Sequence, residues 1–174
     1  MQAVRDMAIY TVHGVSALYA EMINDPAHAL INAASNCIRA CITLAHKHTY
    51  PSRALEASLV AMTPDFVRQC MSAPDHETFF YTGEARGDKV LGILSVSRDG
   101  RIVLCHVDPK SFRKGIGTAL WRTYLKACAP TLTHVDAPLP AVNWFLAKGF
   151  TLDATAMPLH ESLITLPLRW QKTS

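Results

Sequence analysis

The sequence predicts an α/β domain with a mixed, mostly antiparallel central sheet of about six to seven strands and helices on both faces. Apolar residues first recur at helical spacing, through residues 26–62, and then change to short β-branched and aromatic runs. Three of these runs, at 78–82, 90–97 and 102–107, are apolar on both faces, which is typical of strands covered on both sides. Such strands require helices on each face of the sheet.

Helices dominate the expected first half of the chain. Asp25-Pro26 combines an N-cap residue with a proline in the first turn, so a long helix should begin there. His46, Lys47 and His48 suit the negative C-terminal end of that helix. The expected elements are a strand near 7–12, helices at 15–24, 26–45 and 53–62, and a short helix that starts from Thr-Pro-Asp at 63–65.

Strands alternate with helices in the expected second half. Asp99-Gly100 is a hairpin turn between the runs at 90–97 and 102–107. After Gly115 the helical spacing returns, and Pro130 ends it. The elements that follow are a strand at 132–136, a helix at about 140–148, and strands near 150–157 and 163–170.

Length and composition indicate one globular domain over residues 1–174. The chain is 49% apolar and 18% charged, and no repeat, low-complexity tract or flexible linker interrupts it. The net charge of +3 is too mild for a nucleic-acid-binding surface, which would need basic residues clustered on one face. An anionic small ligand fits this charge better.

Cysteine usage and apolar patterning favour the cytoplasm. The five cysteines stand singly in apolar surroundings, without the spacing of a metal site or the density of a disulfide scaffold. Cys37 and Cys41 share a helix face, but no further ligands accompany them, so core packing is the better interpretation and no metal is expected. Asn32, Asn36 and Arg39 interrupt the most apolar helical run, so no membrane span is expected.

The run HVDPKSFRKGIGTALW, at residues 106–121, carries the strongest chemical signal. Gly115 and Gly117 stand where a strand gives way to a helix, and glycines let main-chain N–H groups approach a ligand closely. The free amides of a first helical turn and the helix dipole favour an anion such as a pyrophosphate, and Arg113 and Lys114 add positive charge. By itself the pattern also fits a tight turn or close helix packing.

The wider pattern resembles the GNAT superfamily of acyl-CoA N-acyltransferases. The resemblance covers residues 77–150: strand, Val-Asp-Pro, basic loop, Gly-Ile-Gly-Thr-Ala-Leu, amphipathic helix, and a second helix that ends in Lys-Gly-Phe at 148–150. It implies a parting of the fourth and fifth strands, a pantetheine arm paired with the backbone of Val107, and acetyl-CoA as cosubstrate. The residues that it places around the pyrophosphate are Arg113, Lys114, Gly115, Ile116, Gly117 and Thr118.

The resemblance also implies the reaction, which is transfer of an acetyl or other short acyl group to a small-molecule or peptide amine by direct attack in a ternary complex. Three departures leave an alternative open. Phe112 replaces the usual Gln or Arg, Pro138 stands where Asn is frequent, and Phe145 replaces a tyrosine whose phenol often protonates the thiolate. A non-catalytic acyl-CoA sensor or interaction module is therefore the second hypothesis. A nucleotide-binding protein is disfavoured because the loop lacks P-loop spacing and lysine, and a homodimer is left open.

His106 is the catalytic candidate. Imidazole titrates near working pH, and this histidine lies on the expected cofactor strand, so it could take the proton of the amine. The alternative is a core histidine that is hydrogen-bonded across the sheet. Arg101 stands where some family members place a glutamate base, and Cys105 is disfavoured as a nucleophile in its apolar strand. Weaker candidates are Tyr81, His134, Asp136, His160 and Glu161.

Overall fold

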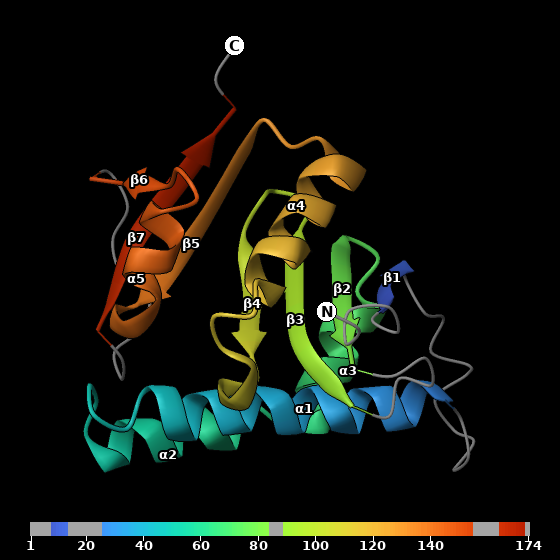
Figure 1. Cartoon of the computed structure of the whole chain (residues 1–174), viewed down its shortest axis with the longest axis vertical. Coiled ribbons are helices and arrows are strands. Elements are labelled where there is room, and N and C mark those ends of the chain that lie inside the picture. Colours follow the sequence, from blue (N-terminus) through green and yellow to red (C-terminus); the bar gives the residue numbers. More distant parts are fainter. Residues whose placement is uncertain (1–7, 14–25, 84–88, 155–163, 173–174) are drawn as a thin grey trace.

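The computed structural model describes residues 8–13, 26–83, 89–154 and 164–172 (Figure 1). The α/β class and the order of the elements within these ranges are confirmed. The expected helix at 15–24 lies outside the described residues. The elements of the first half are β1 (Ala8–His13), α1 (Pro26–Ala45), α2 (Ser52–Ala61), α3 (Pro64–Ser72) and β2 (His76–Thr82). Those of the second half are β3 (Val90–Ser97), β4 (Ile102–Val107), the 3-10 turn η2 (Pro109–Ser111), α4 (Ile116–Cys128), β5 (Leu132–Pro138), α5 (Leu139–Leu146), β6 (Thr151–Leu152) and β7 (Thr165–Gln171).

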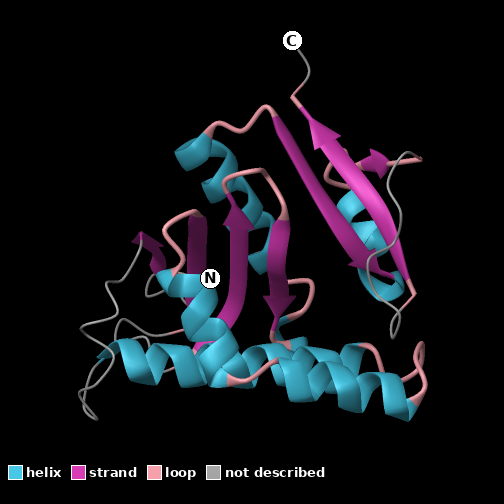
Figure 2. Cartoon of the chain, turned by 180° about the vertical axis from the view of Figure 1, so that it is seen from behind, coloured by secondary structure: helices cyan, strands magenta, loops and turns pink. Residues whose placement is uncertain are grey.

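The described strands form two sheets rather than one continuous central sheet. One sheet has the order β1-β2-β3-β4, the other has the order β5-β7-β6, and every pairing within them is antiparallel. The expected parting between the fourth and fifth strands is confirmed, and it is wide enough to divide the sheet (Figure 2). Only one parallel bridge, between Arg101 and His134, joins the two sheets within the described part of the chain.

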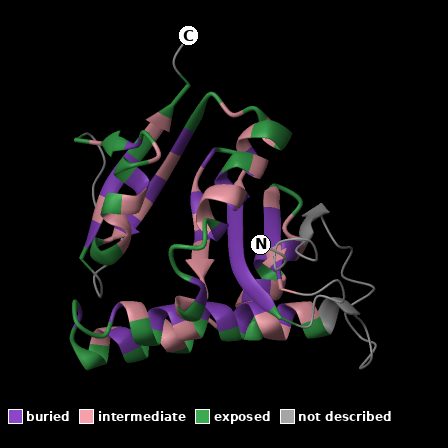
Figure 3. Ribbon diagram, in the orientation of Figure 1, coloured by how far each residue is buried: buried purple, intermediate pink, exposed green. Residues whose placement is uncertain are grey.

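The first sheet is covered on both faces, as its apolar runs predict. Phe80 and Ile93 pack with Ile38 of α1 in one buried cluster, whereas Phe79 and Leu120 of α4 belong to a second cluster. Adjacent strand residues point to opposite faces, so neighbouring phenylalanines serve different cores. Figure 3 shows β3 buried along most of its length, which places it at the centre of the sheet.

Close packing fixes the start of α4 on the sheet. Gly92 of β3 lies under this helix, and a Cβ atom there would stand 2.7 Å from Ile116 Cγ2 and 3.0 Å from Leu120 Cδ1. These separations are far below van der Waals contact, so only glycine lets the helix approach this closely. The first turn of α4 is therefore held rigidly beside the end of β4.

β5 is tied to the first sheet in its first part and, beyond its end, to Tyr50 in the loop between α1 and α2. Near its start, His134 N donates to Gly100 O at 2.9 Å, and Arg101 Nη1 lies 2.9 Å from Asp136 Oδ2. After its end, Leu139 N donates to Tyr50 Oη at 2.8 Å, and that hydroxyl donates to Ile164 O at 2.6 Å. Between these ties the strands diverge.

Local signals placed most element boundaries within a few residues. Thr63 caps α3 as expected, with its Oγ1 accepting from Phe66 N at 3.2 Å. The strand expected near 150–157 is shorter within the described residues: β6 covers Thr151–Leu152, and Asp153 and Ala154 after it are not part of a strand. No described helix is long and apolar enough to cross a bilayer.

Candidate functional site

A cavity of about 670 Å³ opens where β4 and β5 part. Its walls come from the end of α1, the end of β4, the loop and first turn of α4, and the segment from Pro138 to Lys148 that includes α5. The volume lies in the range of small-molecule and cofactor sites. The parting of the strands thus produces a site of the right size for a cofactor.

The entrance of α4 supplies main-chain donors to this cavity. Gly115 has φ of 84° and Arg113 has φ of 63°, so the loop turns through the left-handed region twice before the helix begins. No side chain caps the helix, and first-turn amides have no acceptor inside a helix. Gly115, Ile116, Gly117 and Thr118 all line the cavity. The open amides therefore face a space that an anion could occupy.

The two glycines of this loop serve different purposes. A Cβ atom at Gly115 would meet nothing within 4 Å, so the positive φ is what favours glycine there. A Cβ atom at Gly117 would stand 3.1 Å from the indole of Trp144, so this glycine lets α5 approach α4. Gly117 therefore has two roles: it allows close packing of the two helices, and it forms part of the cavity wall.

Cations surround the same end of the cavity. Arg113 and Lys148 both line it, and Lys148 Nζ lies 5.8 Å from the ring centre of Trp144. Lys114 is exposed and is not among the lining residues, so its charge acts from the rim of the loop. Phe112 lines the cavity with 43% of its surface exposed. A phosphate-bearing ligand would meet positive charge and aromatic surface together.

The β4 wall presents Cys105, His106 and Val107 to the cavity. His106 is partly buried, and burial, followed by the nearby charge of His46, lowers its pKa to about 4. Its imidazole is therefore neutral at neutral pH, with a free lone pair. Burial raises the pKa of the Cys105 thiol to about 12, which agrees with the expectation that it is a poor nucleophile.

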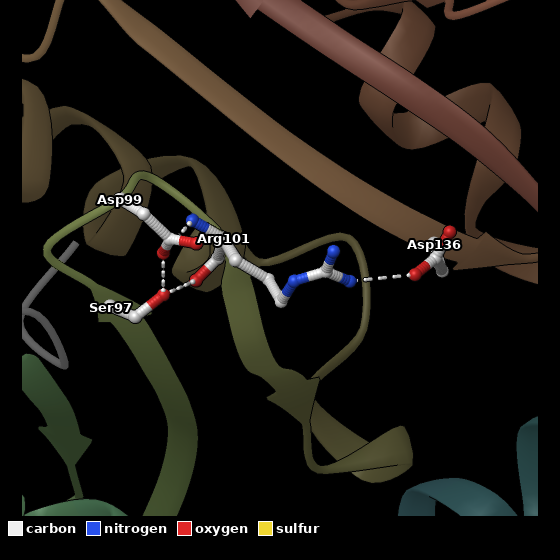
Figure 4. A network of polar contacts seen from close by, with 4 residues as sticks. All are labelled: Ser97, Asp99, Arg101 and Asp136. Carbon is white, nitrogen blue, oxygen red and sulfur yellow. Dashed lines mark hydrogen bonds and ion pairs between the residues drawn. The ribbon is translucent and has the colours of Figure 1, made fainter. Parts of the chain in front are cut away.

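Several sequence candidates lie away from the cavity and hold the sheets together instead. Arg101 points from the start of β4 to Asp136 on β5, and its main-chain N–H donates to Asp99 at 3.3 Å (Figure 4). The Ser97 hydroxyl donates to the same Asp99 carboxylate and, with the Arg101 amide and charge, lowers its pKa. His134 forms the parallel bridge through its backbone. None of these residues lines the cavity.

Of the remaining candidates, some lie in the core, some line the cavity, and some lie outside the described residues. Tyr81 and Trp121 pack against or within the core around α4, outside the cavity. Trp144 lines the cavity, and so does Phe145, although only 2% of its surface is exposed. His160 and Glu161 lie outside the described residues. Of the described histidines, cysteines and acids, no three gather in a way that would hold a metal ion.

Sequence reasoning missed His46. From the sequence, His46 is expected to carry a positive charge that suits the C-terminal end of α1. In the structure its side chain is 6% exposed and lines the cavity, and burial lowers its pKa. A buried neutral imidazole does not interact with the helix end as a cation would. Its position in the cavity depends on how α1 meets β4, so no local signal could have shown it.

Comparison with known proteins agrees with this geometry. Residues 46–158 match the acetyltransferase (GNAT) domain family. The sequence matches no curated protein. The fold is similar to a GCN5-related N-acetyltransferase from Rhodopseudomonas palustris, at 18% identity and a TM-score of 0.71, with 96% of each chain covered.

Two further structures share the fold at low identity. One is the PaiA N-acetyltransferase from Thermoplasma acidophilum in complex with coenzyme A, at 12% identity and a TM-score of 0.64, covering 95% of this chain and 99% of that one. The other is GCN5 from Tetrahymena, at 12% identity and a TM-score of 0.59, with 95% of each chain covered. The chain belongs to the GNAT acetyltransferase family, whose activity is acyl transfer from coenzyme A.

Proposed function

We propose that this chain is an N-acetyltransferase, a single domain over residues 1–174 that transfers an acetyl or other short acyl group from acetyl-CoA to an amine. The observation that carries the proposal is the uncapped first turn of α4, which opens into a cavity with cations at its edge. In a GNAT chain, such donors suit the pyrophosphate of coenzyme A. The acceptor is a small molecule or a peptide.

The cofactor would lie along two walls of the cavity. The amides of Gly115, Ile116, Gly117 and Thr118 would donate to the pyrophosphate, and Arg113 and Lys114 would add charge from the loop. The backbone of Val107, at the open end of β4, would pair with the pantetheine arm. This arrangement would bring the thioester towards His106, which precedes Val107 on the same strand.

His106 would act as the base. The amine nitrogen attacks the thioester carbonyl directly in the ternary complex, and its proton becomes far more acidic as the bond to carbon forms. A neutral imidazole with a low pKa can accept the proton at that stage, since its lone pair is never blocked by a resident proton near neutral pH. Phe145 carries no hydroxyl, so the thiolate would receive its proton back from His106 or from water.

The cofactor site has a direct test. Replacing Arg113 with alanine should weaken coenzyme A binding about 10-fold or more in calorimetry, since a hydrogen bond to a charged group contributes about 1.5–3 kcal/mol. Arg122, an exposed cation of α4 that does not line the cavity, is the matched control, and R122A should bind normally. Equal affinity of the two variants would contradict the proposed placement.

A non-catalytic acyl-CoA sensor is the alternative that Phe145 favours, since this side chain lacks the proton donor that the family often uses. Release of free thiol from acetyl-CoA in the presence of an amine panel separates the two functions. Tight coenzyme A binding without thiol release would favour the sensor. Amine-dependent thiol release would establish the transferase.

A further inference from the structure

The end of α1 brings a second histidine to the cavity. His46 follows the last residue of this helix, and its main-chain N–H donates to Ile42 O at 3.3 Å. Its carbonyl oxygen accepts from Thr49 N at 2.9 Å and Tyr50 N at 3.1 Å. These bonds close a tight turn that fixes the backbone of His46. The imidazole is thus held in the cavity wall by local structure.

One ring nitrogen of His46 lacks a partner. The side chain is 6% exposed, and within the described part of the chain its Nδ1 atom is buried without a hydrogen bond. Leaving a buried polar atom unpaired costs about 1–3 kcal/mol, so such atoms in native proteins usually meet a ligand or water. His46 also lines the cavity, so its ring lies beside the space that a bound molecule would occupy.

The neighbours of His46 leave it neutral. The titratable groups that share the cavity with it are Cys41, Cys105, His106, Arg113 and Lys148. Tyr50 packs edge-to-face against the ring, at 5.8 Å between centres. Burial raises the pKa of both thiols, so neither supplies a negative charge that would hold a proton on His46. Its lone pair is available to a hydrogen-bond donor.

His46 and His106 therefore present two neutral imidazoles to one cavity, near enough that an added proton on His46 would lower the pKa of His106. We propose that His46 is a second catalytic imidazole, which hydrogen-bonds the acceptor amine and shares with His106 the proton that the amine releases. This inference rests on the proposed acyl transfer.

The step balances without any other reactant. The amine nitrogen attacks the thioester carbon, the carbon–sulfur bond breaks, and one proton leaves the nitrogen for the imidazole pair. The same proton, or one from water in exchange, then neutralises the thiolate of coenzyme A. Because a charge on either ring disfavours charge on the other, the pair holds at most one proton beyond the N–H proton that each neutral ring already carries.

The test compares His46→Gln with His48→Gln, which alters an exposed histidine two positions further on. The assay follows thiol release from acetyl-CoA with benzylamine, spermidine and glycinamide, across pH 5–9. We expect H46Q to lower kcat/KM about 10- to 100-fold and to change the shape of the pH profile, because general acid–base groups contribute on this scale. Coenzyme A affinity should be unchanged, and H48Q should match the wild type.

A second measurement needs no variant. In the wild type with coenzyme A bound, the imidazole nitrogen resonances of His46 should shift when the best of the three amines is added. Normal kcat/KM in H46Q, or a His46 signal that ignores the amine in an active enzyme, overturns this inference alone. A wild type that binds coenzyme A but acetylates none of the amines overturns the proposed function, and the role of His46 with it.

Discussion

Replacing Tyr50 with phenylalanine would remove one hydroxyl group from the junction where the loop between α1 and α2 meets the start of α5 and the residue before β7. That hydroxyl accepts from Leu139 N at 2.8 Å and donates to Ile164 O at 2.6 Å, and only 6% of the tyrosine is exposed. Each lost hydrogen bond costs about 1–1.5 kcal/mol, because its main-chain partner loses its bond where the ring still excludes water. The free energy of unfolding should therefore fall by about 2–3 kcal/mol.

Tyr124 provides a matched control. It is 4% exposed, and its hydroxyl has a long contact of 3.4 Å to the Thr133 hydroxyl. Y124F should cost less than about 1 kcal/mol, since a long bond between two hydroxyls contributes little. Near the melting temperature, about 1 kcal/mol shifts the midpoint by roughly 2–4 °C in a chain of this size.

Calorimetric or fluorescence-detected unfolding of both variants would measure the difference. Y50F should melt roughly 5–10 °C below the wild type and several degrees below Y124F. If the two variants lose the same stability, within about 0.5 kcal/mol, the Tyr50 hydroxyl does not tie the loop after α1 to α5 and the start of β7. The reasoning from its two hydrogen bonds would then be wrong.

Three further predictions concern the site and its surroundings. Gly115→Ala should lower the free energy of unfolding by about 1–2 kcal/mol in urea denaturation, because a side chain at φ of 84° is strained; unchanged stability would contradict the left-handed loop. The folded pKa of His106, about 4, lies below its unfolded value of 6.5, so stability is complete above pH 6.5 and is lost as pH falls towards 4. Between pH 7 and 5 this loss should reach at most roughly 2 kcal/mol, and H106Q should reduce the slope. Cys37 and Cys105, each with a pKa raised by burial to about 12, should resist iodoacetamide at pH 8 until the protein is denatured; rapid labelling of the native protein would show that these pKa values are not raised.

The loop before α4 could be predicted because its features are local. Glycine at position 115 favours a positive φ, and the polar run before it does not continue a strand, so the entrance of the helix follows from neighbouring residues. The same is true of the Thr63 cap and of the Asp99-Gly100 turn, which the structure confirms as the link between β3 and β4. Short-range chemistry decides these features.

Contacts between segments that lie far apart in the sequence could not be predicted. His46 reaches the cavity from the end of α1, and Tyr50 joins residues 89 and 114 positions away. Arg101 stands where some family members place a glutamate base, and its partner Asp136 lies on another sheet, which the sequence around Arg101 does not indicate. Strand register and helix placement decide these contacts, and the local spacing of apolar residues predicts neither of them.

The reach of the Tyr50 hydroxyl also bears on how the protein is synthesised. Its acceptor is the carbonyl of Ile164, immediately before the last strand, so this contact is incomplete until β7 has docked. Contacts of such sequence separation form late, since their loop-closure entropy is offset only after the rest of the chain has condensed. A nascent chain on the ribosome would thus carry Tyr50 for more than a hundred residues before this hydroxyl could meet its acceptor.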